Sequence, residues 1–332
     1  MKQYILDLNI KELETKIKTH IDCKYRLIQI VEWIYNKKVD SFEKFKNIPV
    51  GIRKNLSNNF FLRSLIIKNK KRYLVERKIK YIFYSSFGGC FSSIFSFIKN
   101  KNFIYLSSQI GCSEKCFFCF KKKKTYERHL RNGEIIEQIL QVENDTNKKI
   151  TDISICVGEK IINFTNIISL LHSILSNKEL GISGKRIILS TVFNIQFIKK
   201  LMSYNFRVKF SIDLYGTDDK QIKKIISKDF IFKIEDSFNI CKRYINKTGS
   251  ILIINYFILE NINDSVIDAR KLSKLLKRCG LINLNVKINL IVLDNYLNSK
   301  FKSSNEKTIE KFIKILRFNK INVSVKSFNF MY

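Results

Sequence analysis

Apolar and polar positions follow a regular order from about residue 103 onward. Short runs rich in β-branched residues, typical of buried strands, are each followed by a segment with the period of an amphipathic helix. This order predicts parallel strands joined by helices. The expected strands are 103–107, 150–157, 186–191, 207–213, 251–259 and 284–293. The expected helices are about 133–145, 164–177, 194–204, 218–227, 264–278 and 305–318, with another near 231–245.

Six such units predict an α/β fold whose core, residues 101–332, is a partial (β/α)6 barrel. In β/α architectures the reacting groups lie at the carboxyl ends of the strands. We therefore expect a functional site in the loops that follow the strands, and above all in the loop after the first strand.

The amino-terminal segment has a different pattern. Residues from about 8 to 66 have helical periodicity, and Pro49 is placed to begin a short helix. One apolar stripe consists of Ile28, Val31, Ile34 and Tyr35. We expect a small helical accessory domain over residues 1–68.

Between these two parts, basic and apolar residues alternate. The runs 81–84 and 92–95 are expected to be strands on either side of Gly88-Gly89. Residues 69–100 are therefore predicted to form a linking β-hairpin or small sheet.

Composition places limits on the class of protein. The chain has 332 residues, 45% of them hydrophobic, which suffices for a large core and a small accessory domain. No apolar stretch reaches the roughly 18 to 20 residues that span a bilayer, and the amino terminus has no signal-peptide pattern. Eight cysteines are too sparse for a disulfide scaffold. We expect a cytoplasmic protein with no membrane segment.

The chain is strongly basic. It has 61 Lys and Arg against 29 Asp and Glu, a net charge of +32, which favours a polyanionic partner such as nucleic acid. The run 121–124, four consecutive lysines, is a local candidate for phosphate contact. The alternative is codon bias from an AT-rich genome, because Lys, Asn, Ile and Phe are all abundant.

Three cysteines carry the clearest chemical signal. Cys112, Cys116 and Cys119 have C-x3-C-x2-C spacing on the loop after the first predicted strand. Three thiolates can hold three corners of a [4Fe–4S] cluster and leave one iron open for an exogenous ligand such as S-adenosyl-L-methionine. The alternative is a zinc or structural site, although structural zinc takes four ligands and no second pair with such spacing follows.

Four segments in the same order extend this signal along most of the chain: 25–56, 107–119, 126–135 and 260–272. They contain Glu-Trp-Ile-Tyr, the cysteine loop, Tyr-Glu-Arg-His-Leu-Arg-Asn-Gly-Glu-Ile and Glu-Asn-Ile-Asn-Asp-Ser. Together they resemble the radical S-adenosylmethionine 23S rRNA adenine-C2 methyltransferases, the RlmN and Cfr family.

The resemblance implies a [4Fe–4S] cluster on Cys112, Cys116 and Cys119, with S-adenosylmethionine as the cofactor. It implies 23S rRNA, and also tRNA, as substrates. It also implies an electron donor such as a flavodoxin or ferredoxin, and a monomeric enzyme.

Positions that contact the cofactor follow from the same resemblance. Gly158 and Glu159 match the family's Gly-Glu after the second strand, where a glycine permits close backbone approach and a carboxylate can accept from an amino group. Ser190 matches a cofactor-binding serine at the end of the third strand, although a Ser-Thr pair there could also be a helix cap.

Later motifs of the family are altered in this chain. Asp213-Leu214-Tyr215 stands for the family's Ser-Leu-His, where Asp213 could bond a ribose hydroxyl or act as a structural cap. Asp294 takes the place of a cofactor-contacting Asn.

Three parts that the family uses for methyl transfer are expected to be missing. The sequence ends at Tyr332, before the expected position of the methyl-carrying cysteine, and Tyr105 stands where the resolving cysteine is expected. Ser92 falls nearest to the family's upstream glutamate. No catalytic residue is therefore assigned from the sequence.

Five further cysteines could replace the missing thiols. Cys23 is expected on the accessory helix, Cys156 in a buried strand and Cys241 in a helix, where a cysteine is usually a small core residue. Cys90 in the hairpin and Cys279 at a helix end are the two candidates, because a reactive thiol needs exposure and a lowered pKa.

Two functions remain open at this point. The chain is either a radical enzyme that methylates adenine C2, or a degenerate relative that binds cluster, cofactor and RNA without completing methyl transfer. A third and weaker possibility is a radical enzyme of the same fold that acts on another substrate.

Overall fold

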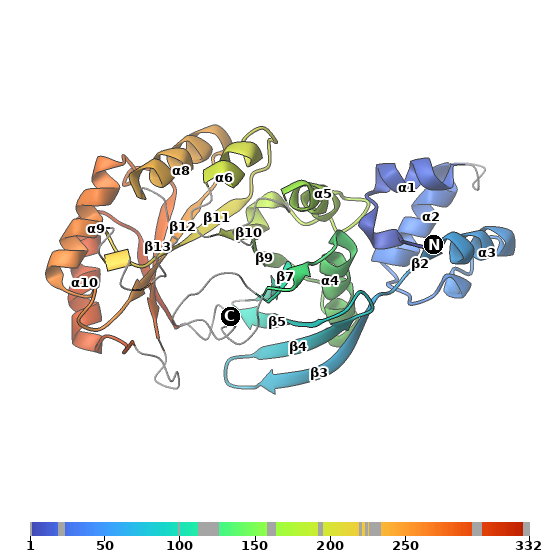
Figure 1. The fold of residues 1–332 in the computed structure, drawn as a ribbon, viewed down its shortest axis with the longest axis horizontal. Helices are drawn as coiled ribbons and strands as arrows, with labels where there is room; N and C mark the ends of the chain where they lie inside the picture. Colours follow the sequence, from blue (N-terminus) through green and yellow to red (C-terminus); the bar gives the residue numbers. More distant parts are fainter. Residues whose placement is uncertain are drawn as a thin grey trace. The chain divides into compact units, whose positions relative to one another are not determined.

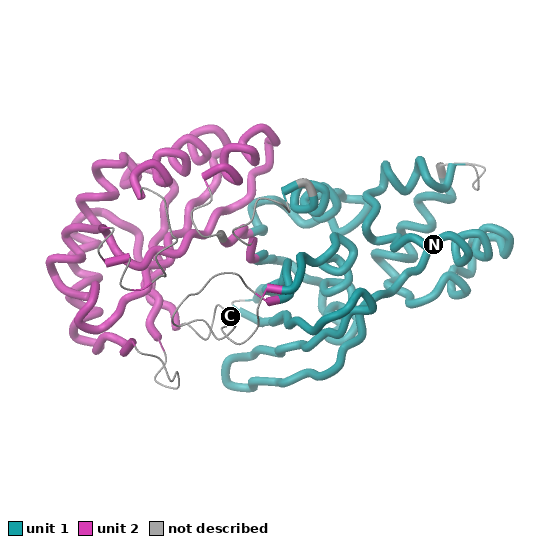
Figure 2. Tube along the Cα trace, viewed as in Figure 1, with its two compact units in different colours: residues 1–110, 127–155, 162–187 teal, residues 111–126, 156–161, 188–332 magenta. Residues whose placement is uncertain are grey.

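The structure is a computed structural model that describes residues 2–18, 24–98, 100–111, 126–157, 164–191, 195–218, 221–222, 225, 234–293 and 301–327. The chain forms two compact units, coloured separately in Figure 2. Unit 1 comprises residues 1–110, 127–155 and 162–187, and unit 2 comprises 111–126, 156–161 and 188–332.

Unit 1 begins with helices and continues into a largely antiparallel sheet (Figure 1). Its helices are α1 (Ile10–Ile17), α2 (Lys24–Tyr35), α3 (Val50–Asn59), α4 (Asn132–Thr146) and α5 (Phe164–Leu175). Its strands are β1 (Gln3–Tyr4), β2 (Phe60–Phe61), β3 (Leu65–Tyr73), β4 (Lys78–Ser85), β5 (Cys90–Ile98), β6 (Lys101–Leu106), β7 (Gln109–Ile110), β8 (Arg128–His129) and β9 (Asp152–Cys156).

Pairing in unit 1 changes direction at β6. Strands β3, β4, β5 and β6 pair antiparallel in that order, whereas β6 and β9 pair parallel. A parallel pair needs a crossover connection, and α4 provides it between β6 and β9.

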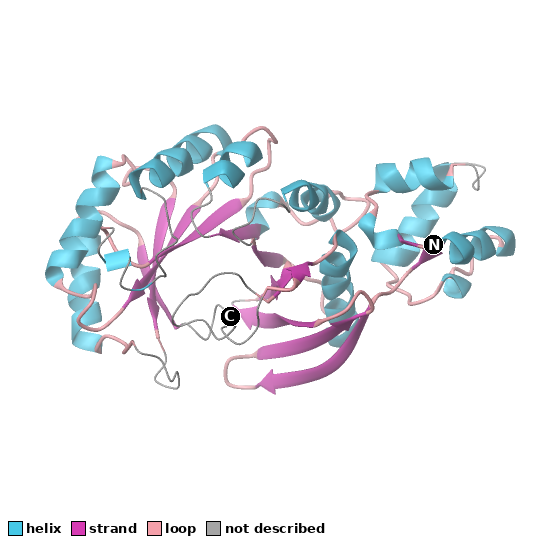
Figure 3. Ribbon diagram, in the orientation of Figure 1, coloured by secondary structure: helices cyan, strands magenta, loops and turns pink. Residues whose placement is uncertain are grey.

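Unit 2 contains five parallel strands in the order β10 to β14. Figure 3 colours the strands magenta and the helices cyan. The strands are β10 (Ile187–Thr191), β11 (Lys209–Leu214), β12 (Leu252–Ile258), β13 (Val286–Val292) and β14 (Val323–Ser327). The described helices are α6 (Ile195–Leu201), α8 (Ile234–Thr248), α9 (Val266–Arg278) and α10 (Glu306–Phe318).

The helices of unit 2 pack on one face of these strands because alternate strand residues are large and apolar. Phe210 of β11 meets Phe197 of α6 and Tyr244 of α8, with ring centres 6.2 Å and 4.8 Å apart. Tyr256 of β12 meets Phe312 of α10 at 5.4 Å. The intervening residues of each strand necessarily face the other side.

Local sequence sets where the long helices begin. The Ser265 side chain accepts from Asp268 N at 3.2 Å, and the Asp268 carboxylate accepts from Ser265 N at 3.1 Å, which is a capping box at the start of α9. Asn305 caps α10 by accepting from Thr308 N at 2.9 Å.

The predicted α/β fold with alternating strands and helices is confirmed. The six expected strands correspond to β6 and β9 to β13, and the extra helix near 231–245 corresponds to α8. Most of the expected helix 218–227 lies outside the described residues. The division into three domains, at residues 68 and 100, stays a prediction.

Two details of the amino-terminal half differ from expectation. Ile28 was placed in an apolar stripe but is 50% exposed, whereas Val31, Ile34 and Tyr35 of the same stripe are buried. The hairpin expected over 69–100 is larger, because β3 begins at Leu65 and pairs along β4.

In the part of the chain that the structure describes, no helix has the length and apolar content to cross a bilayer.

Candidate functional site

The two ends of the cysteine loop are fastened together. Strands β7 and β8 pair antiparallel, with Gln109 opposite His129 and Ile110 opposite Arg128. The pairing continues on both sides, where Glu127 N donates to Ile110 O at 3.0 Å and Leu130 N donates to Ser108 O at 2.9 Å. We call this two-stranded element, 109–110 with 128–129, the clasp. It brings the two ends of the loop together through main-chain hydrogen bonds.

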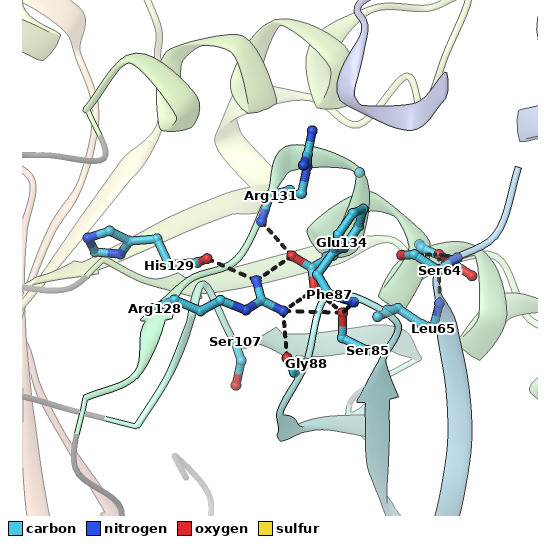
Figure 4. Close-up of polar contacts among 12 residues, drawn as sticks. Ser64, Leu65, Ser85, Phe87, Gly88, Ser107, Arg128, His129, Arg131 and Glu134 are labelled. Carbon is cyan, nitrogen blue, oxygen red and sulfur yellow. Dashed lines mark hydrogen bonds and ion pairs between the residues drawn. The ribbon is translucent and has the colours of Figure 1, made fainter. Parts of the chain in front are cut away.

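A bidentate ion pair holds the clasp (Figure 4). Both terminal nitrogens of Arg128 donate to Glu134, Nη1 to Oε2 and Nη2 to Oε1, each at 2.8 Å. Glu134 on α4 is fully buried, and its carboxylate also accepts from Ser85 Oγ at 2.6 Å and Arg131 N at 2.8 Å. Hydrogen bonding to Glu134 raises the pKa of Arg128 above its ordinary value. A buried carboxylate with this many donors has a single favourable position.

The clasp also fits closely against the turn between β4 and β5. Arg128 Nη2 donates to Gly88 O at 2.8 Å. Gly89 has φ +89°, and a Cβ there would lie 2.6 Å from Ile110 Cδ1 and 2.9 Å from Glu127 Oε2. Only glycine combines this backbone with so close a neighbour, so the turn and the clasp form one packed element.

Helix α4 fixes the chain just before the clasp. Gln138 is fully buried, its Oε1 accepts from Ser107 N at 3.2 Å, and its Nε2 donates to Ser107 O at 3.1 Å. Ser93 of β5 also donates its hydroxyl to Gln138. The main-chain N–H and C=O of Ser107, just after β6, are therefore both bonded to the Gln138 side chain.

The cysteines of the loop lie outside the described residues, as do Gly158, Glu159 and Asp294. Within the described residues, no group of three or more His, Cys, Asp or Glu side chains is arranged to hold a metal. Among the described residues, the clasp is the element next to the predicted cluster site, and it holds both ends of the loop that carries Cys112, Cys116 and Cys119.

In unit 2, a row of polar side chains crosses four adjacent strands. Asp213, Asn255, Asn289 and Ser324 are direct neighbours in the strand register. Asn255 is fully buried, Asn289 is 2% exposed and Asp213 is 9% exposed. All lie on the strand face opposite to the helices. We call this row the polar ladder.

Hydrogen bonds in the polar ladder all run in one direction. Ser324 Oγ donates to Asn289 Oδ1 at 2.9 Å, and Asn289 Nδ2 donates to Asn255 Oδ1 at 2.9 Å. Asn255 Nδ2 then donates to Asp213 Oδ1 at 2.8 Å and to Ser211 Oγ at 2.8 Å. Each amide is fixed by its neighbour, and the series ends on a carboxylate that acts as acceptor. The Asp213 carboxylate therefore suits a ligand that presents hydroxyl or amino donors.

The other predicted cofactor positions in unit 2 differ in exposure. Ser190 is half-buried and pairs with Ser211 in the strand register. Leu214 is fully buried, and Tyr215 is 4% exposed with its ring centre 4.9 Å from that of Phe257. The structure thus brings Ser190 and Asp213 to adjacent strands, and it packs Leu214 and Tyr215 into the core.

Sequence patterns alone did not single out the middle of the polar ladder. Asn255 interrupts an otherwise apolar strand, and Asn289 lies within the apolar run 288–292, which is the signal that could have identified them. A buried polar residue in a strand needs a partner, and here the partner lies on the next strand.

Ser92 and Tyr105, expected at the family's glutamate and resolving-cysteine positions, share one face of the sheet. Ile94 pairs with Tyr105, and Ser92 lies two residues before Ile94 on the same strand. Cys90, two residues further back, faces the same side and is partly exposed. Burial raises the pKa of Tyr105 to about 12, so this phenol stays protonated at neutral pH.

Two of the remaining cysteines differ from expectation. Cys156 was expected in a buried strand but is exposed at the end of β9. Cys279 was a candidate for a replacement thiol, but it is buried, and burial raises the pKa of its thiol, the opposite of what a reactive thiol needs. Cys279 also follows α9 at the end where β13 begins, away from the carboxyl ends of the strands. Burial raises the pKa of Cys241 to about 12. Cys23 lies outside the described residues.

Known proteins are similar to this chain over nearly its full length. The family described as "Ribosomal RNA large subunit methyltransferase N-terminal domain" matches residues 4–62. A probable dual-specificity RNA methyltransferase RlmN of Endomicrobium trichonymphae is 44% identical over 326 residues, which is 98% of this chain and 93% of that protein. One from Clostridium botulinum strain Loch Maree is 29% identical over 323 residues, 97% of this chain and 93% of that protein.

A solved structure has the same fold. A radical SAM methyltransferase from Sphaerobacter thermophilus superposes with a TM-score of 0.88 at 23% sequence identity. The superposition covers 98% of this chain and 95% of that one.

Proposed function

Because the chain belongs to the RlmN family of RNA methyltransferases and has the fold of a radical S-adenosylmethionine methyltransferase, we propose that it methylates C2 of an adenine in 23S rRNA, and also in tRNA. The observation that carries the proposal is the 44% identity over 98% of the chain. The net charge of +32 supports a polyanionic substrate.

The proposed cluster ligands are Cys112, Cys116 and Cys119, which would hold a [4Fe–4S] cluster with one iron open. Such a cluster supplies an electron that cleaves S-adenosylmethionine and makes radical chemistry possible at an electron-poor carbon. The protein's own part is to present the three thiolates. The clasp supports this role, because Arg128 and Glu134 hold the loop ends together and reduce the entropy lost when the ligands converge.

The proposed cofactor contacts are at the carboxyl ends of the strands. Asp213, oriented by Asn255, would accept from a ribose hydroxyl, and Ser190 on the next strand would donate or accept nearby. Glu159 would accept from the amino group of the cofactor, with Gly158 allowing close approach. The proposed set is completed by Leu214, Tyr215 and Asp294.

The remaining partners are proposed from the same family membership. An electron donor such as a flavodoxin or ferredoxin would reduce the cluster, and the protein would act as a monomer in the cytoplasm.

A second function is favoured by the substituted face of the sheet. Tyr105 and Ser92, which stand for the resolving cysteine and the upstream glutamate, lie on the same face of β5 and β6. The phenol of Tyr105 cannot perform thiol chemistry, and the hydroxyl of Ser92 cannot accept a proton as a carboxylate does. The chain would then bind cluster, cofactor and RNA without completing methyl transfer.

One anaerobic experiment separates these functions. The protein is reconstituted with iron and sulfide, reduced, and incubated with S-adenosylmethionine and unmodified 23S RNA. Mass spectrometry then measures 5′-deoxyadenosine and 2-methyladenosine. Both products support the methyltransferase, and Cys90→Ala is then the first variant to test for a replacement thiol. 5′-Deoxyadenosine without methylated base supports the second function. Bound zinc in place of iron, with neither product, contradicts both.

A further inference from the structure

The sheet formed by β3 to β6 has two unlike faces. One face packs on α4, where Tyr81 is fully buried and donates to Asp145 Oδ2 at 2.8 Å. Lys70 on this face is paired with Asp145 Oδ1 at 2.6 Å. The cation and the carboxylate on this side are therefore already matched within the protein.

The opposite face carries a row of residues fixed by strand register. Lys71 pairs with Lys80, Lys80 pairs with Ile94, and Ile94 pairs with Tyr105. Tyr73 lies two residues after Lys71 and faces the same side. We call these residues, Lys71, Tyr73, Lys80, Ile94 and Tyr105, the open face. The first is exposed and the other four are partly exposed.

Within the described part of the chain, the lysines of the open face are not paired with carboxylates, whereas Lys70 on the α4 face is paired with Asp145. Among the ion pairs of the described residues, none includes Lys71 or Lys80. Lys71 Nζ lies 5.2 Å from the centre of the Tyr73 ring. Two ammonium groups and two aromatic rings thus share one surface without an acidic side chain in the row.

Protection of the sheet edge explains only part of this surface. Lysines on an edge strand prevent pairing with a second sheet, and β3 is such an edge. Lys80, however, lies on β4 and Tyr105 on β6, and both strands are paired on two sides. These two residues have no edge to protect.

The combination fits a nucleic-acid strand. Lysine ammonium groups neutralise phosphates, and an aromatic ring stacks on a base of any sequence. Three strand spacings separate Lys71 from Tyr105, a distance of about 14 Å, which a short oligonucleotide can cover. The protonated phenol of Tyr105 adds no negative charge next to a phosphate.

We propose that the open face binds a single-stranded segment of the RNA substrate, with phosphates on Lys71 and Lys80 and a base stacked on Tyr105. This inference rests on the proposed function for the identity of the polyanion. It assigns a role to Tyr105, which stands at the family's thiol position and cannot serve as a thiol.

The test is fluorescence anisotropy of a labelled ten-nucleotide single-stranded RNA with the full chain. In Lys71→Ala/Lys80→Ala we expect binding about 10-fold weaker near 0.15 M salt, with the salt slope reduced by about 1.4. Lys311→Ala/Lys314→Ala on α10 removes the same charge from exposed positions elsewhere, and we expect a change of less than about twofold. Equal losses of RNA affinity in both double variants would show that only the net charge matters, and this would overturn the proposal.

Tyr105 separates stacking from charge. Tyr105→Leu should bind about 10-fold more weakly with an unchanged salt slope, while Tyr105→Phe should stay within about twofold of the parent. The Phe variant keeps the ring and removes only the hydroxyl, and urea unfolding of both variants separates lost stacking from lost folding. Unchanged binding by Tyr105→Leu, or equal competition by duplex RNA or polyglutamate, would overturn the proposal. The assay needs no turnover: RNA binding lost through these variants supports the inference even if no methylated base is ever formed.

Discussion

Tyr35 on α2 donates its phenol hydroxyl to Glu179 Oε1 at 3.2 Å and so joins the amino-terminal helices to the turn after α5. Both residues are buried, at 5% and 6% exposure. Burial raises the pKa of Tyr35 well above its ordinary value, and burial also raises the pKa of Glu179. Inside unit 1, the Tyr35 hydroxyl and the Glu179 carboxyl therefore bond to each other in place of the water that they would contact in the unfolded chain.

Removing the donor should weaken this junction. Tyr35→Phe leaves Glu179 with one partner fewer in a buried site, and we expect the free energy of unfolding to fall by about 1–2 kcal/mol. Urea unfolding measures it. Tyr25→Phe is the matched control, because Tyr25 is 62% exposed on the same helix and should change stability by less than about 0.5 kcal/mol. Equal effects of the two variants would mean that the hydroxyl contact contributes nothing.

The raised pKa of Glu179 predicts a pH dependence. The carboxyl loses its proton at a higher pH in the folded state than in the unfolded state, where it titrates near 4.5. The folded state binds more protons in that interval, so this group's contribution to stability falls as pH rises from 4.5 through the folded pKa.

Glu179→Gln removes this titration while keeping an oxygen that can accept from Tyr35. Relative to the variant, the natural chain should lose stability between about pH 4.5 and pH 7, as measured by urea unfolding at both values. A constant difference between the two proteins across this range would contradict the prediction.

Loss of the clasp ion pair should release the cysteine loop. Arg128→Gln leaves Glu134 buried without its cation, and we expect unfolding free energy to fall by about 2–4 kcal/mol. Bound iron per chain and the decay of cluster absorbance after reconstitution measure the effect on the loop. Both should decrease.

Arg131→Gln is the control for the clasp. Arg131 pairs with Asp7 at an exposed position, and its main-chain contact with Glu134 survives the substitution. We expect a stability change below about 1 kcal/mol and normal iron content. If Arg128→Gln also kept normal iron content, the clasp would have no part in holding the cluster.

The polar ladder can be tested by moving its charge. Asn255→Asp places two carboxylates side by side, which should lower stability by about 2–4 kcal/mol. The double variant Asp213→Asn/Asn255→Asp restores a donor opposite an acceptor and should recover most of that loss. Calorimetric binding of S-adenosylmethionine should remain about 10-fold weaker in the double variant, because the carboxylate has moved to the next strand.

Recovery of both stability and affinity in the double variant would show that the position of the carboxylate is unimportant for binding. Ser324→Ala, at the far end of the ladder, is the control and should cost less than about 1 kcal/mol.

Local patterns in the chain were sufficient to identify most of its elements and its family. The alternation of β-branched runs and amphipathic segments predicted β6 and β9 to β13, although not β14, because strand and helix periods are properties of neighbouring residues. The spacing of Cys112, Cys116 and Cys119 and the flanking motifs indicated the family in the same way, since they are short and continuous.

Tertiary structure decided which distant residues meet and which way they face. The sequence placed Asp213 at a strand end, but only strand register shows that Asn255, Asn289 and Ser324 stand beside it. Likewise, Lys70 and Lys71 are adjacent and chemically identical, yet the first pairs with Asp145 and the second lies on the open face. The physical reason is that side chains alternate across a strand, so a shift of one residue in register exchanges the two faces, and register is set by long-range packing.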